Sequence, residues 1–401
     1  MKKKNALTDV IVPKGFYFSA VEAAIKKPGR KDLALIYSEK EAVMSGVFTT
    51  NRVKAAPVKL DIKRITSGRG QAIVVNSGNA NACSGKQGMK DAVEITGLIG
   101  DRLKLGRGSV YVCSTGVIGT PMPMERIRAK VPHLIAGLGK GTLRDTAAAI
   151  MTTDTFPKIV SRKVKVGRTS GTVTGICKGA GMICPHMATM LCFIMTDLAI
   201  TKPALDKALS DAVNSSFNKI TIDGDMSTND TVIAMANALA CNDIIKSGSG
   251  SFNSFSSALS TVTGELSRLI VKDGEGATKL VEIEVRNARN SSDAEKAAFA
   301  VAHSLLVKTA IYGNDANWGR IMAALGYSGV FIDEGKADIY FGRVRVAKRG
   351  VSTGKDREAA VVLKDKEIRI TIDLHLGKAS SKVLTCDLTE AYVRINAEYR
   401  T

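Results

Sequence analysis

Histidine, aromatic residues and proline are all scarce in this chain. Its 401 residues include four histidines, one tryptophan and nine prolines, and aromatic residues make up 5% of the total. A mechanism that needs no histidine would suit such a composition. No run of about twenty apolar residues occurs, so we expect no membrane-spanning helix. Because Met1-Lys-Lys-Lys4 is not followed by an apolar segment, we also expect no secretory signal and a cytoplasmic location.

Paired cysteines are missing too. The seven cysteines have no repeated C-x-x-C spacing, and several lie in apolar runs, as Cys113 and Cys192 do. This usage is typical of small buried side chains in a reducing compartment. The cluster Cys184-Pro-His186 with Cys192 lacks the spacing of a zinc site, so we expect no metal. The nucleotide-binding glycine motifs of kinases and dehydrogenases are absent as well.

Acidic residues are outnumbered by basic ones, and the formal net charge is +19. Nucleic-acid binding, an anionic small substrate, or a generally basic proteome would each account for this charge. The lysines and arginines are scattered singly, apart from Lys2-Lys3-Lys4, and are not interleaved with aromatic residues. This pattern favours a solvated surface over a nucleic-acid interface. Salt-dependent binding to DNA or RNA would support the nucleic-acid alternative.

Strand and helix patterns alternate along the whole chain. With 45% hydrophobic residues and 37 glycines, the chain is long enough for two domains with cores of ordinary size. Short apolar runs predict strands, and apolar residues at helical spacing predict helices. The main ranges are strands at 33–37, 43–48, 72–75, 110–113, 171–177, 339–341 and 368–373, and helices at 89–105, 142–151, 202–216, 258–271 and 292–309. The Ser- and Gly-rich range 247–257 predicts an exposed loop. These alternating patterns predict layered sheets and helices of the α/β or α+β type, not a helical bundle.

One segment suggests a specific chemistry. Lys178-Gly-Ala-Gly-Met-Ile-Cys-Pro-His-Met-Ala-Thr189 places a glycine-containing loop before a short apolar run. If the Ala188–Thr189 bond is cut, Thr189 carries both a hydroxyl nucleophile and a free α-amine. An α-amine has a pKa near about 8, so it can accept the hydroxyl proton at neutral pH. A strand beginning with a β-branched residue is the alternative interpretation of the Ala-Thr junction alone.

This segment closely resembles the self-cleavage motif of the ornithine acetyltransferase family, also called the bifunctional glutamate N-acetyltransferase family of arginine biosynthesis. Matching segments extend from Phe48 to Thr401, nearly the whole chain. The resemblance implies an α/β fold of layered sheets and helices shared with related self-processing peptidases. It also implies cleavage into an α chain, 1–188, and a β chain, 189–401. Two such pairs would assemble into a heterotetramer.

The resemblance assigns roles to further residues. Thr115 and Gly116 match an oxyanion hole, which agrees with a strand that ends in Thr-Gly and exposes N–H groups at a tight turn. The matching substrate-binding residues, which include the nucleophile itself, are Thr152, Lys178, Thr189, Glu275, Asn396 and Thr401. The resemblance thus predicts an ordered C-terminus, although chain ends usually fray.

The resemblance implies transfer of an acetyl group from N-acetylornithine to glutamate through an acetyl-threonine intermediate. No metal or prosthetic group is expected, and acetyl-CoA is a co-substrate only in some members, an alternative that the sequence leaves open. Asp223 and Asp225 are interpreted as loop-ordering carboxylates, because an N-terminal threonine needs no acid/base pair. His186 and Ala316 stand where that family commonly has Asn and Pro. A self-processing amide hydrolase or aminopeptidase of related architecture is the nearest rival.

Overall fold

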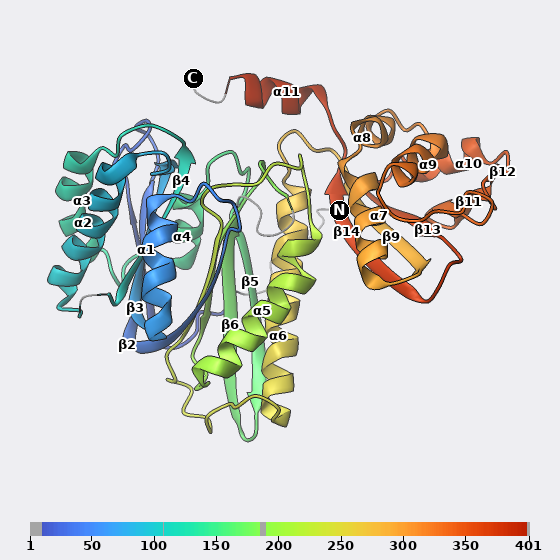
Figure 1. The fold of residues 1–401 in the computed structure, drawn as a ribbon. Coiled ribbons are helices and arrows are strands. Elements are labelled where there is room, and N and C mark those ends of the chain that lie inside the picture. Colours follow the sequence, from blue (N-terminus) through green and yellow to red (C-terminus); the bar gives the residue numbers. More distant parts are fainter. Residues whose placement is uncertain (1–9, 107, 185–189, 399–401) are drawn as a thin grey trace, which may run out of the picture. The chain divides into compact units, whose positions relative to one another are not determined.

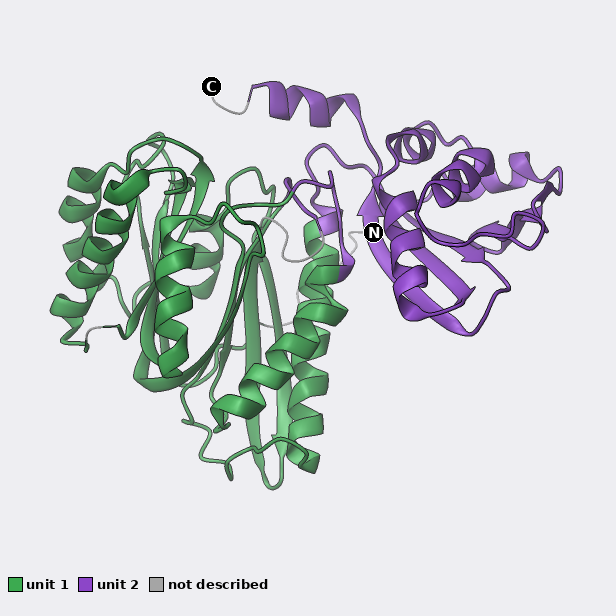
Figure 2. Ribbon diagram, in the orientation of Figure 1, with its two compact units in different colours: residues 1–179, 186–218, 226–270 green, residues 180–185, 219–225, 271–401 purple. Residues whose placement is uncertain are grey.

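The computed structural model describes residues 10–106, 108–184 and 190–398. The chain divides into two compact units, coloured separately in Figure 2. Unit 1 takes residues 1–179, 186–218 and 226–270, and unit 2 takes residues 180–185, 219–225 and 271–401. Both units therefore draw on residues from each side of the Ala188–Thr189 bond.

Unit 1 is built on one mixed sheet of eight strands (Figure 1). Its order is β4-β3-β2-β8-β7-β6-β5, with β1 paired to β2. The pairs β3–β4 and β7–β8 are parallel, whereas β6–β7 and β2–β8 are antiparallel. The strands are β1 (Phe16–Val21), β2 (Leu33–Phe48), β3 (Arg69–Asn79), β4 (Val110–Val117), β5 (Lys158–Val166), β6 (Thr169–Lys178), β7 (Leu191–Thr196) and β8 (Thr231–Ala236).

Helices cover both faces of this sheet because its central strands are apolar on both sides. α4 packs on the face that carries Ile36, Ile73 and Ile176. α2 and α3 pack on the opposite face, over Leu35 and Val74. The helices are α1 (Ala56–Arg64), α2 (Gly85–Leu103), α3 (Met124–Ala136), α4 (Leu143–Ala149), α5 (Lys202–Ser215) and α6 (Gly250–Lys272), whose last two residues belong to unit 2.

Unit 2 holds a six-stranded sheet in the order β12-β11-β10-β13-β9-β14. Helices α7 to α10 bury one face of it around Ile283, Val301 and Leu325. The other face carries charged pairs such as Arg369–Glu282. The elements are β9 (Leu280–Ala288), α7 (Ser291–His303), α8 (Leu305–Tyr312), α9 (Trp318–Gly326), β10 (Asp338–Phe341), β11 (Val344–Lys348), β12 (Val351–Ser352), α10 (Asp356–Val362), β13 (Glu367–Asp373), β14 (Ala379–Cys386) and α11 (Glu390–Ala397).

The expected layered α/β fold is confirmed, and two local expectations were wrong. The predicted loop 247–257 contains the first two turns of α6, which begins at Gly250. Phe252 and Phe255 are buried, and that burial outweighs the low helix propensity of the surrounding Ser and Gly. The predicted helix 292–309 is broken at Ser304, whose hydroxyl caps α8 by accepting the Val307 N–H. Within the described ranges, no helix is long and apolar enough to cross a membrane.

Candidate active site

The end of β4 forms a tight turn beside the end of β3. Ser77 of β3 lies opposite Thr115, and Gly78 lies opposite Gly116. Gly116 has φ +135°, and a Cβ there would lie 2.2 Å from the carbonyl carbon of Gly78. Only glycine allows this approach, because any side chain would overlap the neighbouring strand. An oxyanion hole uses backbone N–H donors, and the sequence resemblance assigns that role to Thr115 and Gly116.

Lys178 lies next to this turn. It is the last residue of β6 and is almost fully buried. Its Nζ lies 3.4 Å from Oγ1 of Thr115. In the antiparallel register, Lys178 is opposite Leu191, the first residue of β7. The chain therefore leaves the sheet after Lys178 and returns to it two residues after Thr189, at the same end of the two strands.

A buried carboxylate organises these residues. Asp154 accepts the backbone N–H groups of Thr152 and Gly179 at 3.1 and 2.7 Å. It also forms ion pairs with Lys158 at 2.7 Å and Lys178 at 3.9 Å. One side chain thus positions the backbone of Thr152, the ammonium of Lys178 and the first residue of the loop that leads toward position 189.

Charge pairing keeps Asp154 ionised. Burial raises the pKa of its carboxyl, but the ammonium groups of Lys178 and Lys158 and the Gly179 N–H outweigh burial and hold the pKa at about 2. Two buried ammonium groups, those of Lys158 and Lys178, therefore face the Asp154 carboxylate in unit 1.

A second buried carboxylate, Asp230, holds the residue that follows Thr189. Its Oδ1 accepts the backbone N–H of Met190 at 2.9 Å, while within the described ranges its Oδ2 has no hydrogen-bond partner. Burial raises the pKa of Asp230 well above the ordinary value, against the opposing effects of the Met190 N–H and Lys178. Asp230 thus fixes the backbone of the residue that directly precedes β7.

Glu275 and Asn396 meet in unit 2. The Nδ2 of Asn396, on α11, donates to Oε2 of Glu275 at 2.8 Å. The Glu275 backbone N–H bonds the carbonyl of Ala180 at 2.7 Å. A Cβ at Gly181 would lie 2.4 Å from the Glu275 carboxylate. The glycines of the sequence motif therefore make room for a carboxylate that is 8% exposed.

Helix α11 is fastened to the rest of unit 2. The Tyr392 hydroxyl donates to Asp223 at 3.2 Å, and the Thr389 hydroxyl donates to the carbonyl of Gly276 at 2.7 Å. Asp223 also accepts the backbone N–H groups of Met182 and Ile183. Asp223 thus orders a loop, as the sequence interpretation predicts. These hydrogen bonds tie α11 to unit 2, and the predicted order at Thr401 falls outside the described residues.

The predicted site residues fall into three groups. Four lie in unit 1, three of them near the ends of β4 and β6 and one between α4 and β5, and two lie together in unit 2. The groups are Thr115, Gly116, Thr152 and Lys178, then Glu275 and Asn396, and finally Ala188, Thr189 and Thr401, which lie outside the described residues. Asp154 and Asp230 were missed as functional candidates, because only their long-range contacts distinguish them. Across residues 10–106, 108–184 and 190–398, no group of three or more His, Cys, Asp or Glu side chains is arranged to hold a metal ion.

Comparison with known proteins adds sequence evidence to this geometry. The ArgJ family model matches residues 17–401. The arginine biosynthesis bifunctional protein ArgJ of Geobacter sulfurreducens is 56% identical over 390 residues, covering 97% of this chain and 99% of that protein. The protein of the same name from Caldanaerobacter subterraneus is 51% identical, covering 97% of this chain and 98% of that protein.

A solved structure matches half of the chain. The arginine biosynthesis bifunctional protein argJ from Bacillus halodurans is 44% identical with a TM-score of 0.50. The match covers 51% of this chain and 97% of the solved chain. The solved chain is thus about half as long as this one.

Proposed function

Because this chain belongs to the ArgJ family and is therefore an acetyltransferase of arginine biosynthesis, we propose that it transfers the acetyl group of N-acetylornithine to glutamate. Ornithine and N-acetylglutamate are the products. The match extends over nearly the whole chain, so the complete set of predicted site residues lies within it.

The reactive group is made by self-cleavage. The Thr189 hydroxyl adds to the Ala188 carbonyl, and the turn at Thr115 and Gly116 stabilises the oxyanion. Collapse of this adduct breaks the Ala188–Thr189 amide and leaves an ester on the Thr189 oxygen. That step already frees the α-amine of Thr189; water then hydrolyses the ester, which frees the Thr189 hydroxyl and leaves Ala188 with a C-terminal carboxylate.

One observation carries this proposal. Lys178 ends β6 directly opposite the start of β7, with its ammonium 3.4 Å from the Thr115 hydroxyl. The loop that includes Thr189 therefore departs from the proposed oxyanion turn, and β7 begins two residues after Thr189. Near an α-amine, the Lys178 charge would lower the amine pKa by like-charge repulsion and increase the fraction of free base.

Turnover then proceeds in two half-reactions. The Thr189 hydroxyl attacks the acetyl carbonyl of N-acetylornithine, and its own α-amine passes the proton to the departing ornithine nitrogen. The acetyl-threonine ester is next attacked by the amine of glutamate, which leaves as N-acetylglutamate. The kinetics are ping-pong, because the first product leaves before the second substrate binds.

The other predicted residues bind substrate. The Glu275 carboxylate suits the side-chain ammonium of ornithine, since opposite charges at hydrogen-bond distance give the stronger kind of hydrogen bond. Asn396 orients that carboxylate by its 2.8 Å hydrogen bond. Thr152 and Lys178 offer a hydroxyl and a cation to the α-carboxylate, and Thr401 completes the set.

The two cleavage products, 1–188 and 189–401, remain associated. In unit 1, β7 and β8 from the second product lie between β6 and β2 from the first. Separating the products would break backbone hydrogen bonds on both sides and expose a buried sheet. The half-length solved chain of the Bacillus halodurans relative supports this division. Two such pairs form the proposed heterotetramer.

No metal or prosthetic group is required, because the α-amine supplies the base. We further propose acetyl-CoA as a second acetyl donor, and the word bifunctional in the names of the relatives supports this activity. Formation of N-acetylglutamate from acetyl-CoA and glutamate, without N-acetylornithine, tests it. The names of the relatives favour acetyl transfer over the rival amide hydrolase or aminopeptidase.

Replacement of the nucleophile tests the whole scheme. Thr189→Ala should give one inactive chain of 42.6 kDa by intact mass, whereas the parent protein gives two fragments that divide before Thr189. Thr189→Ser is the matched control, since it keeps a hydroxyl and should still be cut. A cut and active Thr189→Ala protein would refute the assignment. Loss of N-acetylornithine at a rate independent of glutamate would instead indicate a hydrolase.

A further inference from the structure

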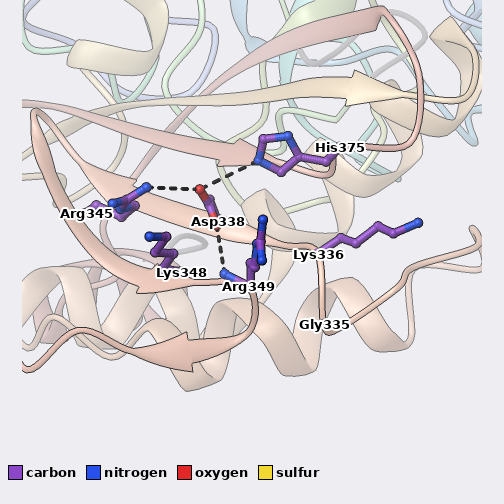
Figure 3. A pocket seen from close by; sticks show the side chains of 7 residues that line it. All are labelled: Gly335, Lys336, Asp338, Arg345, Lys348, Arg349 and His375. Carbon is purple, nitrogen blue, oxygen red and sulfur yellow. Dashed lines mark hydrogen bonds and ion pairs between the residues drawn. The ribbon is translucent and has the colours of Figure 1, made fainter.

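Unit 2 contains a basic cavity that the proposed acetyl transfer does not use. The cavity has a volume of about 620 Å³ and lies at the end of β10 and β11 (Figure 3). This size is within the range of small-molecule sites, about 300–1,000 Å³. Its lining residues are Gly335, Lys336, Asp338, Arg345, Lys348, Arg349 and His375. Four of the seven are cations and one is a carboxylate.

The single carboxylate serves to hold the basic residues in place. Asp338 is nearly buried, and it accepts the backbone N–H of Arg349 at 2.8 Å. It also pairs with Nη1 of Arg345 at 3.4 Å and lies 3.6 Å from Nε2 of His375. The dashed lines of Figure 3 show these three interactions converging on one carboxyl group. The four cationic side chains that line the cavity outnumber this single negative charge, so the cavity still favours an anion.

Among the residues that the structure describes, two cations at the cavity have no side-chain partner. Lys336 pairs with Asp333 at 3.4 Å, and His375 also lies 3.4 Å from Asp373. By contrast, within the described ranges the side chains of Lys348 and Arg349 make no hydrogen bond or ion pair. These two side chains are adjacent in sequence and exposed at the cavity. They are available to bind a ligand.

The backbone at Arg349 has an uncommon conformation. Arg349 has φ +49°, a left-handed conformation that is uncommon for a residue with a side chain. The next residue, Gly350, has φ +72°, and a Cβ there would lie 2.2 Å from the Glu334 carbonyl oxygen. His375, on the opposite side of Asp338, also has φ +49°. Strained residues of this kind concentrate at binding sites.

We infer that this cavity is a binding site for a phosphate-bearing small molecule, separate from the acetyl-transfer residues. Arginine and lysine together give a phosphate group both forked hydrogen bonds and point charges. A monocarboxylate would leave most of the donors without a partner. Nucleic acid is a poorer fit, because His375 is the only aromatic ring among the seven lining residues on which a base could stack. Inorganic phosphate and the phosphates of a nucleotide share the recognised chemistry.

The test is direct binding to the full, processed protein. Inorganic phosphate and adenosine bisphosphate are titrated by calorimetry, with succinate as a carboxylate probe. Both phosphates should bind, and succinate should bind at least tenfold more weakly. A higher affinity for adenosine bisphosphate than for inorganic phosphate would identify a nucleotide as the ligand. Equal affinities for the two would identify the phosphate group alone as what is recognised.

A charge-matched pair of variants locates the binding. Lys348→Gln with Arg349→Asn removes both unpartnered cations, and asparagine tolerates the left-handed backbone at position 349. Phosphate affinity should fall at least tenfold. Lys364→Gln with Lys366→Gln removes the same charge from exposed positions outside the cavity and should leave affinity within about twofold. Lys348→Glu, a single exposed change, gives a second measure by charge reversal.

Three results would overturn the inference. The first is the absence of phosphate binding to the parent protein at millimolar concentration. The second is an equal loss of affinity in the cavity variant and in the matched surface variant, which would indicate general attraction to a basic protein. The third is succinate binding as tight as phosphate binding. Equal thermal midpoints for the two double variants establish that neither loss reflects unfolding.

Discussion

Asp154 and Lys158 form an ion pair of 2.7 Å in which neither side chain has any exposed surface. Taking two charges out of water costs free energy that is recovered only while both partners remain. The same carboxylate also holds Lys178 and the backbone of Thr152. Stability and the proposed active site therefore depend on one buried group.

Asp154→Asn should destabilise the protein strongly. The substitution removes the carboxylate that pairs with the buried ammonium groups of Lys158 and Lys178, which costs about 3–5 kcal/mol. Urea unfolding in a Thr189→Ala background measures this on a single uncut chain. Asp211→Asn is the matched control, because it breaks an exposed pair with Lys207 that is worth about 0–1 kcal/mol. Equal losses for the two variants would contradict the role of Asp154.

Asp154 should also make stability depend on pH in acid. Its pKa in the folded protein, about 2, is below the ordinary 3.8, so the unfolded chain binds the proton more tightly. A carboxylate with a lowered pKa contributes its full stabilisation above pH about 4 and loses it as the pH falls toward about 2. Unfolding free energies measured across this range should fall more steeply for the parent than for Asp154→Asn. Asp61 and Asp230, whose pKa values are raised by burial, act in the opposite direction in both proteins and cancel in the difference. If the unfolding free energies of the parent and of Asp154→Asn changed equally with pH, Asp154 would not be the group that titrates.

Gly116→Ala should block self-cleavage. The added Cβ would overlap the Gly78 carbonyl carbon at 2.2 Å, so the oxyanion turn must open. The uncut fraction, followed by intact mass, should decay at least tenfold more slowly than in the parent. Gly119→Ala is the control, since its φ of +80° also strains an alanine, by about 1–2 kcal/mol, but no atom lies within 4 Å. Normal cleavage in the Gly116 variant would exclude the turn from the chemistry.

Asn396→Ala should weaken substrate binding through Glu275. Loss of the 2.8 Å hydrogen bond frees the carboxylate to rotate, so KM for N-acetylornithine should rise several-fold while kcat changes less. A double-mutant cycle with Glu275→Gln should give a coupling energy of about 0.5–3 kcal/mol. Tyr312→Phe removes another tether of α11, the 2.7 Å hydrogen bond to Glu390, and controls for simple loosening of the helix. If the effects of Asn396→Ala and Glu275→Gln on substrate binding were simply additive, Asn396 would not act through Glu275.

The sequence predicted helices and strands correctly where the buried residues are the apolar ones that recur at helical or strand spacing. The helix expected at 89–105 is α2, and the strands expected at 110–113 and 171–177 lie within β4 and β6. The error at 247–257 has a long-range cause. Val262 and Leu266 of α6 pack against Gly175 of β6, and no pattern within the Ser- and Gly-rich segment reveals that partner.

What the sequence determined by itself is chemical identity: a threonine after alanine in a glycine-containing motif, a glycine after Thr115, a lysine eleven positions before Thr189. These features depend only on residue type and on spacing along the chain, so they can be read directly from the sequence. Only the tertiary structure decided that Asp154 joins Thr152, Lys178 and Lys158, or that Asp338 gathers a basic cavity. The physical reason is that charge interactions depend on distance and burial, and pairing of strands far apart in the chain sets both.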